Sequence, residues 1–264
     1  MKKAIFLDID GTILEALNGI KEITPRVAKA IRSLQEKGHY VFIATGRPYA
    51  FLPKSILEFG FDGFILGNGA HVIVNKETLH LEHMDKSFVL ELVSKLEAMK
   101  VQYILEGEMY SYLKDTHKEF YEFYKQVGMS LQWFESHYMT EDVDVFKIEM
   151  LCLDDEVYHS CLELLAGHEE YDYVSSIDKR ICELYSKKNT KATAILKTLQ
   201  HLNIPIENSF AFGDGKNDIE MLREVKYGIA MGNASSEVKK HAKYVTDSVS
   251  NDGVALGIEK YVMN

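Results

Sequence analysis

The sequence predicts an α/β protein with a doubly wound parallel sheet. Short apolar runs of strand length occur at residues 3–8, 40–44, 63–66, 208–212 and 226–230. They alternate with longer amphipathic runs of helix length at residues 25–37, 48–58, 190–202 and 217–223. Strands that alternate with helices of this size are joined by right-handed crossovers, which place helices on both faces of a parallel sheet.

The first predicted helix has clear boundary signals. Thr24 is a capping residue and Pro25 occupies the first helical position, where its missing N–H is tolerated. Gly38 follows the last apolar residue and suits a left-handed helix end. These signals support a helix over residues 25–37.

The first apolar run ends in two carboxylates, Asp8 and Asp10, followed by Gly11 and Thr12. An Asp-x-Asp-Gly stretch alone is also typical of a plain turn, because Asp and Gly both form turns. At the carboxyl end of a parallel strand, however, ligands bind, and two aspartates one residue apart can converge on one cation. The position therefore favours a functional site over a turn alone.

Three further segments follow apolar runs or open helices in the same way. Thr45, Gly46 and Arg47 follow the second strand, and Lys191 opens an amphipathic run. The fourth segment is Gly213-Asp214-Gly215-Lys216-Asn217-Asp218, which follows the fourth predicted strand. Each signal is weak alone, but the four in this order predict one site at one edge of the sheet.

The pattern changes between about residues 83 and 187. We expect a helix at 86–99, an aromatic helix at 116–127, and strands at 103–106, 109–113, 146–151, 171–175 and 180–185. Phe120, Phe123 and Tyr124 recur at helical spacing and are expected in a core rather than on a ligand. No catalytic set of residues is evident here, so the segment resembles an inserted α+β domain.

Charge and composition limit the function. The net charge of −10 argues against nucleic acid as a partner, because backbone phosphates need a basic patch. Four acids in one cleft, Asp8, Asp10, Asp214 and Asp218, require a divalent cation before an anion can enter. Oxygen ligands with room for water suit Mg²⁺ better than zinc.

The three cysteines, Cys152, Cys161 and Cys182, lack metal-site spacing and are expected to be reduced core thiols. The apolar runs are far shorter than the ~18 residues of a membrane span, and no signal-peptide pattern is present. We therefore expect a cytoplasmic protein without a membrane or nucleic-acid partner; the oligomeric state is not readable from these patterns.

These residues resemble the haloacid dehalogenase-like superfamily, and within it the Cof-type phosphatases. Asp8-Ile9-Asp10-Gly11-Thr12, Thr45-Gly46-Arg47, Lys191 and Gly213–Asp218 look like the four motifs of that family. The resemblance implies a Rossmann-like catalytic core at residues 1–82 and 188–264. It also implies an inserted α+β cap at residues 83–187, which selects the substrate.

The resemblance further implies a phosphatase that hydrolyses small phosphomonoesters through an aspartyl phosphate. Asp8 would be the nucleophile and Asp10 the general acid and base. Mg²⁺ would be held by the Asp8 carboxylate, the Asp10 carbonyl and the Asp214 carboxylate, with Asp218 acting directly or through water. The predicted phosphate-binding groups are Ile9, Gly11, Thr45, Gly46, Lys191 and Asn217, with Arg47 binding substrate or pairing with an acid.

Some alternatives stay open. Lys188 is the fallback for Lys191, and Asp218 could simply serve the dipole of the helix that follows it. A phosphomutase uses the same two aspartates. A non-catalytic phosphosugar-binding protein would keep the fold without turnover.

Overall fold

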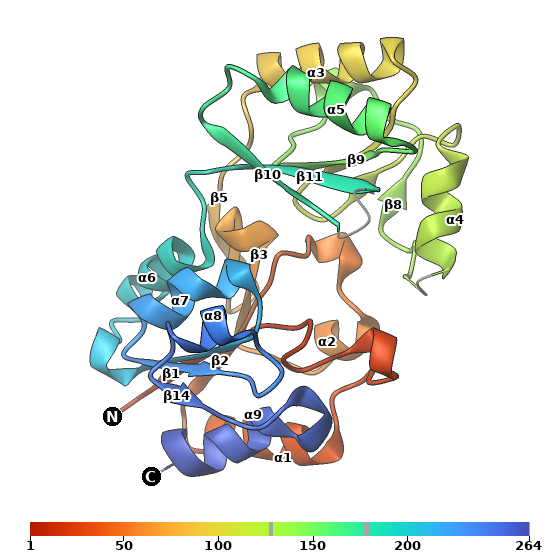
Figure 1. Cartoon of the computed structure of the whole chain (residues 1–264). Coiled ribbons are helices and arrows are strands. Elements are labelled where there is room, and N and C mark those ends of the chain that lie inside the picture. The colour runs from red at the N-terminus through yellow and green to blue at the C-terminus, as the bar shows by residue number, and fades with distance from the viewer. Residues whose placement is uncertain (127–128, 177–179, 264) are drawn as a thin grey trace. The chain divides into compact units, whose positions relative to one another are not determined.

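The computed structural model describes residues 1–126, 129–176 and 180–263, which form two compact units (Figure 1). Unit 1 comprises Met1–Gly46, Lys54–His80 and Asn189–Asn264, and unit 2 comprises Arg47–Pro53 and Leu81–Lys188. Arg47–Pro53, which the predicted division assigns to the core, thus groups with unit 2. The reason is apolar packing, which stacks the Phe51 ring on Phe134 at 5.5 Å between centroids.

An eight-stranded sheet forms the centre of unit 1, in the order β14-β13-β12-β1-β2-β3-β4-β5. Its strands are β1 (Ala4–Leu7), β2 (Tyr40–Ala44), β3 (Gly63–Leu66), β4 (His71–Val74), β5 (Glu77–Leu81), β12 (Ser209–Gly213), β13 (Tyr227–Ala230) and β14 (Tyr244–Val245). The strands from β14 to β3 are parallel, and β4 is antiparallel to β3. The predicted parallel sheet is confirmed, with β4, β5 and β14 as additions.

The strand β1 lies between β12 and β2, with Leu7 beside Phe212 and Ile43. The chain passes from β1 to β2 on one side, and the later strands fill the other side. The strand order therefore reverses at β1 and β12, and open α/β sheets bind ligands beyond the carboxyl ends of the strands at such a reversal.

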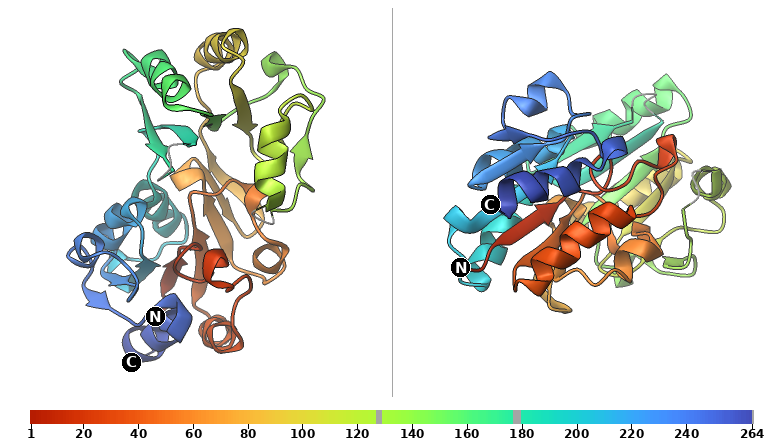
Figure 2. Two further views of the ribbon diagram at one scale, coloured as in Figure 1. Left: turned by 45° about the vertical axis from the view of Figure 1, so that its right-hand side comes forward. Right: turned by 90° about the horizontal axis from the view of Figure 1, so that it is seen from below.

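Helices pack on both faces of this sheet. They are α1 (Pro25–Glu36), α2 (Lys54–Leu57), α6 (Lys191–His201), α7 (Ile219–Glu224), α8 (Ser236–Lys239) and α9 (Gly253–Gly257), followed by a π-helical turn, η8 (Ile258–Val262). The helices α1 and α9 contact each other, and Figure 2 shows them side by side below the sheet. The helices α6 and α7 form a second contacting pair, with α7 on β12 and β13.

The helix predicted at residues 48–58 is wrong as a single element. The structure has a 3₁₀ turn, η2 (Tyr49–Phe51), and then the short α2. Leu52 between them is extended, with φ −74° and ψ 130°. The cause is Pro53, because a proline disfavours helical dihedrals in the residue before it.

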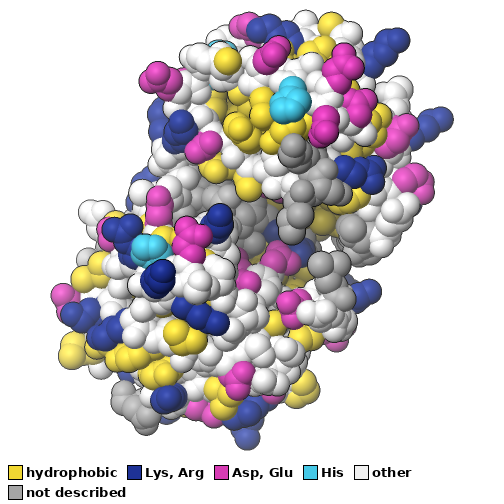
Figure 3. Space-filling view, viewed as in Figure 1, with side chains coloured by type: hydrophobic (Ala, Val, Ile, Leu, Met, Phe, Trp, Pro, Cys, Tyr) yellow, Lys and Arg dark blue, Asp and Glu magenta, His cyan; other side chains and the backbone are white. Residues whose placement is uncertain are grey.

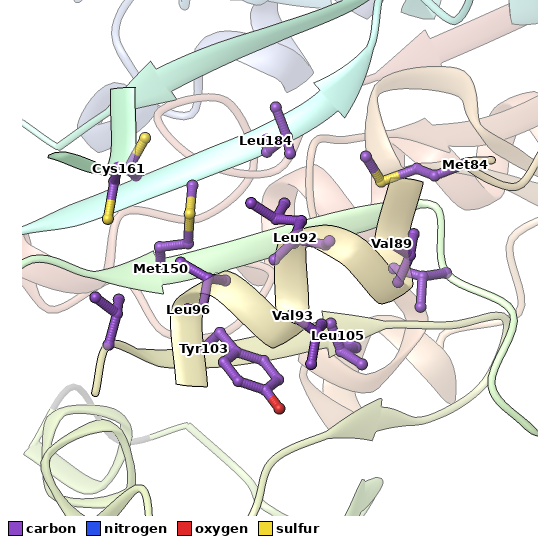
Figure 4. Close-up of a cluster of buried hydrophobic side chains, with 14 of the residues drawn as sticks. Met84, Val89, Leu92, Val93, Leu96, Tyr103, Leu105, Met150, Cys161 and Leu184 are labelled. Atoms are coloured by element: carbon purple, nitrogen blue, oxygen red, sulfur yellow. The ribbon is translucent and has the colours of Figure 1, made fainter. Parts of the chain in front are cut away.

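Unit 2 contains a six-stranded sheet in the order β10-β11-β9-β6-β7-β8. The strands are β6 (Gln102–Glu106), β7 (Ser111–Tyr112), β8 (Phe134–Glu135), β9 (Lys147–Leu151), β10 (Tyr171–Ser175) and β11 (Ile181–Ser186). The helices are α3 (Lys86–Ala98), α4 (Lys118–Gln126) and α5 (Asp155–Leu165). Leu92, Val93 and Leu96 of α3 pack onto side chains of this sheet (Figure 4). The predicted α+β character of the segment is confirmed.

The aromatic side chains of α4 belong to a core, as predicted. Phe120 and Tyr124 are buried, and Phe123 packs against their cluster. Val127, the last residue of the predicted helix, lies outside the described residues. The three cysteines are buried free thiols in unit 2, which confirms that prediction.

Among the residues whose structure is described, no helix is long and apolar enough to cross a membrane. On the face shown in Figure 3, acidic and basic side chains are interspersed.

Candidate active site

Asp8 directly follows β1 in unit 1, where its amide donates to the Phe212 carbonyl at 3.0 Å. The residue is 6% exposed. Its Oδ1 accepts a hydrogen bond of 2.7 Å from the Lys191 ammonium. A carboxylate this buried needs such a partner, because an isolated buried charge is costly.

Lys191 is the first residue of α6 and is 1% exposed. Thr190 caps the helix in a reciprocal pair with Thr193. The ammonium also donates to Asp218 Oδ1 at 2.6 Å. Burial alone would lower the pKa of Lys191. The charges of Asp218 and Asp8 raise it by more, so the pKa lies above its ordinary value. Lys188, the fallback, instead pairs with Glu82 and has a largely exposed side chain.

Asp214 and Asp218 lie just beyond β12, in the loop and the 3₁₀ turn η6 (Lys216–Asp218). Asp218 Oδ2 accepts the amides of Asp214 and Gly215, both at 2.9 Å. With Lys191 on its other oxygen, the Asp218 carboxylate shapes the loop that presents Asp214. If Asp218 only stabilised the dipole of the helix that follows it, it would need neither of these contacts.

Asp8, Asp214 and Asp218 each offer an oxygen, and these atoms lie within 4.8 Å of one another. Burial and the charge of Asp218 raise the pKa of Asp8 well above its ordinary value, more than Lys191 lowers it. The same two causes raise the pKa of Asp214 to about 6. Clustered carboxylates that resist ionisation together fit a hard divalent cation with oxygen ligands.

Gly11, Thr12 and Asn233 surround Asp214. Gly11 has a φ of +75°, and a Cβ there would lie 2.1 Å from Asp214 Oδ2. The Thr12 hydroxyl donates to Asp214 Oδ1 at 3.4 Å, and the Asn233 amide donates to Oδ2 at 3.1 Å. The sequence prediction missed Asn233, although it follows the predicted strand at 226–230 and the strand-end argument applied to Asp214 would have found it.

The prediction that the Gly11 amide binds phosphate does not fit this geometry. That N–H donates to the Leu14 carbonyl at 2.7 Å, closing the turn that also joins the Ile9 carbonyl to Ile13 and Leu14. Gly11 is required for its left-handed backbone and for the space it leaves beside Asp214.

Thr45 and Gly46 follow β2, and the structure brings them to Asn68. Thr45 is 1% exposed, and its backbone bonds to Ile65 and Asn68. A Cβ at Gly46 would lie 3.1 Å from Asn68 Oδ1. That oxygen also accepts from Asn217 Nδ2 at 3.1 Å, so two distant predicted segments meet at Asn68.

Asp10 is exposed, and its charge adds to the raised pKa values of Asp8 and Asp214. Arg47 belongs to unit 2, where its guanidinium donates to the Phe51 carbonyl at 3.0 Å. The acceptor is a carbonyl rather than an acid, so this contact ties Arg47 to the loop, and the roles of binding substrate or pairing with an acid remain predictions.

Comparison with known proteins identifies the family. The family model of haloacid dehalogenase-like hydrolases matches residues 5–258. The chain belongs to the haloacid dehalogenase-like hydrolases.

The sequence similarity to known relatives extends along nearly the whole chain of this hydrolase. Two Bacillus subtilis (strain 168) proteins named as phosphatases are similar to it. YkrA is 31% identical over 98% of this chain and 97% of its own. The 5-amino-6-(5-phospho-D-ribitylamino)uracil phosphatase YcsE is 29% identical over 99% and 96%. The solved structure of the HAD subclass IIB sugar phosphatase BT4131 covers 98% of this chain and 99% of that one, with 27% identity and a TM-score of 0.79. This haloacid dehalogenase-like hydrolase is therefore a phosphatase of small phosphate esters.

Gly11→Ala in this hydrolase is expected to weaken divalent-cation binding by about tenfold or more, the scale of a disturbed ligand environment. A Cβ 2.1 Å from Asp214 Oδ2 must displace that carboxylate. Gly19→Ala is a matched control, because Gly19 has a φ of +83° and nothing within 4 Å of its Cβ position. Titration with Mn²⁺, followed by electron paramagnetic resonance, would measure both variants. Equal affinities would contradict the displacement of Asp214.

Divalent-cation binding by this hydrolase is expected to weaken about tenfold between pH 7.5 and pH 5, because one proton competes at a pKa of about 6. Asp214 has a higher pKa in the folded than in the unfolded chain, so the metal-free fold takes up the proton first. Its contribution to stability therefore falls as pH rises from about 4 to 6. Calorimetry in buffers of different ionisation enthalpy should detect more proton release at pH 5 than at pH 7.5, because the Asp214 proton is displaced only at the lower pH. Equal release at both would contradict the assignment.

Proposed function

We propose that this chain is a Mg²⁺-dependent phosphatase that hydrolyses small phosphomonoesters through an aspartyl phosphate on Asp8. The observation that carries the proposal is the buried Asp8 carboxylate, which is bonded to Lys191 and lies within 4.8 Å of oxygens of Asp214 and Asp218. We therefore place the nucleophile, the ammonium that binds it and the cation ligands together, beyond the carboxyl ends of β1 and β12.

In the first step an Asp8 oxygen attacks phosphorus, and the bond from phosphorus to the ester oxygen breaks. Asp10 donates a proton to the departing alkoxide. In the second step a water oxygen attacks the same phosphorus while Asp10 takes its proton. Phosphate leaves and the Asp8 carboxylate is restored. The exposure of Asp10 suits a group that exchanges protons with substrate and water.

The transferring phosphoryl group carries charge on three oxygens and needs donors around it. Lys191 is held by Asp8 and Asp218 and supplies the positive charge. Thr45, the Gly46 amide and Asn217 are the proposed neutral donors. Asn68 bonds to Thr45 and Asn217 and lies beside Gly46. The Ile9 amide is the proposed donor next to Asp8.

The Asp8 and Asp214 carboxylates and the Asp10 carbonyl would hold Mg²⁺. Asp218 would support Asp214 by accepting the amides of the loop that carries it. When bound, the ion screens the negative nucleophile from the incoming anion and stabilises charge in the transition state. Burial and the charge of Asp218 raise the pKa of Asp8, so a cation bound there would favour the ionised carboxylate that attacks phosphorus.

We assign substrate selection to unit 2, as a cap, and propose sugar phosphates or related metabolites as substrates. The relatives support this class: BT4131 is a sugar phosphatase, and YcsE acts on a phosphoribitylamino compound by name.

The test is release of phosphate from a panel of phosphomonoesters, with Mg²⁺ and with a chelator. We expect turnover with Mg²⁺ on at least one sugar phosphate and loss of turnover with the chelator. A phosphomutase would isomerise a sugar phosphate without stoichiometric phosphate release. Absence of turnover on every ester would favour the binding-protein alternative.

A further inference from the structure

Asn233 lies in the loop after β13 and joins three segments that are distant in sequence. Its Nδ2 donates to the Gly11 carbonyl at 2.8 Å and to Asp214 Oδ2 at 3.1 Å. Its Oδ1 accepts the Val249 amide at 2.9 Å. We propose that Asn233 is a positioning residue that sets the geometry of the divalent-cation site; the inference rests on the proposed function.

The orientation of the amide follows from its partners. A backbone N–H can only donate, so Oδ1 must face Val249, and a carbonyl can only accept, so Nδ2 must face Gly11. The side chain therefore uses both of its donor hydrogens and its acceptor on the protein, although the residue is exposed. An Asn that only formed a surface turn would leave these groups to water.

The Gly11 carbonyl and the Asp214 carboxylate are both acceptors that lie close together, and two such oxygens repel each other. The Asn233 NH₂ group bridges them with its two hydrogens. Without this bridge the repulsion would rotate the Asp214 carboxylate or open the turn at Gly11. Either change would move Asp214 relative to Asp8.

The hydrogen bonds to Asp214 that the described residues provide come from neutral groups, the Thr12 hydroxyl and the Asn233 amide. The Lys191 ammonium bonds Asp8 and Asp218 instead. A neutral donor fixes the orientation of Asp214 without competing with a cation for its charge. Support of this kind, one shell out from the ligands, commonly changes metal affinity by about 10- to 100-fold.

The loop that carries Asn233 is itself held firmly. The Gly232 amide donates to the Asp247 carbonyl at 2.9 Å, and a Cβ at Gly232 would lie 2.6 Å from the Ser248 nitrogen. The loop at 231–233 thus packs closely on the segment that contains Val249. Asn233 transmits this fixed position to Asp214 and Gly11.

The experiment compares Asn233→Ala and Asn233→Leu with the wild type in Mn²⁺ titrations followed by electron paramagnetic resonance. We expect about tenfold weaker Mn²⁺ binding in both variants. The Leu variant keeps the size of the side chain, so equal losses assign the effect to hydrogen bonds rather than to a cavity. Phosphate release should recover when Mg²⁺ is raised, which separates weak metal binding from lost chemistry.

Asn251→Ala is the matched control, because Asn251 donates an equivalent bond to Asp247 at 3.0 Å. It should bind Mn²⁺ as the wild type does. Urea unfolding without metal reports any purely structural effect. Wild-type Mn²⁺ affinity in folded Asn233→Ala, or a loss only in the Leu variant, would overturn the inference. Failure of the wild type itself to bind Mn²⁺ would instead contradict the proposed function.

Discussion

Asp8→Asn is expected to lower phosphate release by roughly 10⁴-fold or more, the scale on which other enzymes with covalent intermediates lose activity without their nucleophile. The Asn amide keeps the size of the side chain but cannot attack phosphorus. The measurement is kcat on the best ester of the panel with saturating Mg²⁺.

The fold of this variant should persist. Asp8 is one of three clustered carboxylates, and its pKa is raised by burial and by the charge of Asp218. Removing its charge relieves repulsion, so metal-free Asp8→Asn should unfold at the same or a higher temperature than the wild type. Asp142→Asn, at an exposed aspartate of unit 2, is the control for activity. Retention of more than a tenth of the wild-type rate by Asp8→Asn would remove Asp8 from the nucleophile role.

Lys147→Met is expected to lower the free energy of unfolding of unit 2 by about 3–5 kcal/mol, the usual result of breaking a buried ion pair. The Lys147 ammonium is 3.3 Å from Glu106, 3.2 Å from Glu149 and 2.7 Å from Glu183. The Lys147, Glu106 and Glu149 side chains are at most 4% exposed. Without the lysine, buried carboxylates face one another with no cation between them.

The loss should depend on pH. Burial raises the pKa of Glu106 well above its ordinary value, even though Lys147 opposes this. Burial also favours the neutral form of Glu149, but Lys147 and hydrogen bonds lower its pKa overall. In Lys147→Met the Glu149 pKa should therefore rise above its unfolded value. The folded variant then binds more protons than the unfolded chain, so its stability falls as pH rises, and the gap to wild type widens from pH 5 to pH 8.

Urea unfolding can follow unit 2 through Trp133, the single tryptophan of the chain, which packs against Tyr49 and Tyr110. Lys125→Met is the control, because Lys125 is exposed and pairs with Glu122 on α4. It should change stability by less than about 1 kcal/mol. Glu106→Gln should also be tolerated, since burial disfavours the charged form of the carboxyl that it replaces. A loss in Lys147→Met no larger than in Lys125→Met would show that water reaches the cluster.

The strand-end argument worked where the sequence pattern is local. It placed Asp8, Thr45 and Asp214 at the carboxyl ends of β1, β2 and β12 because apolar runs of strand length can be recognised from the sequence alone. It could not choose between Lys188 and Lys191 without the resemblance, since both are lysines in one polar stretch. Lys191 is buried at the start of α6, whereas the Lys188 side chain is exposed. This difference distinguishes the two lysines, and it depends on the fold.

The rest depends on pairings that no local pattern encodes. β14 has two residues, too few for a periodic signal, and β4 runs antiparallel after a tight turn. Lys147 and Glu149 alternate with apolar residues in β9, a pattern typical of a solvent-facing side, yet both are buried. The bridge from Asn233 to Gly11 spans more than two hundred residues and becomes visible only when the sheet is assembled.

Engineers who wish to remove unit 2 face a constraint from the chain path. The side chains of His80 and Asn189 approach to 3.4 Å, so a short graft could reconnect the truncated ends there. Arg47–Pro53 would remain, however, and would lose the aromatic neighbours against which Tyr49 and Phe51 pack. A minimal version of this enzyme therefore needs a polar replacement for those seven residues. Without it, the exposed aromatic side chains of the loop are expected to promote aggregation.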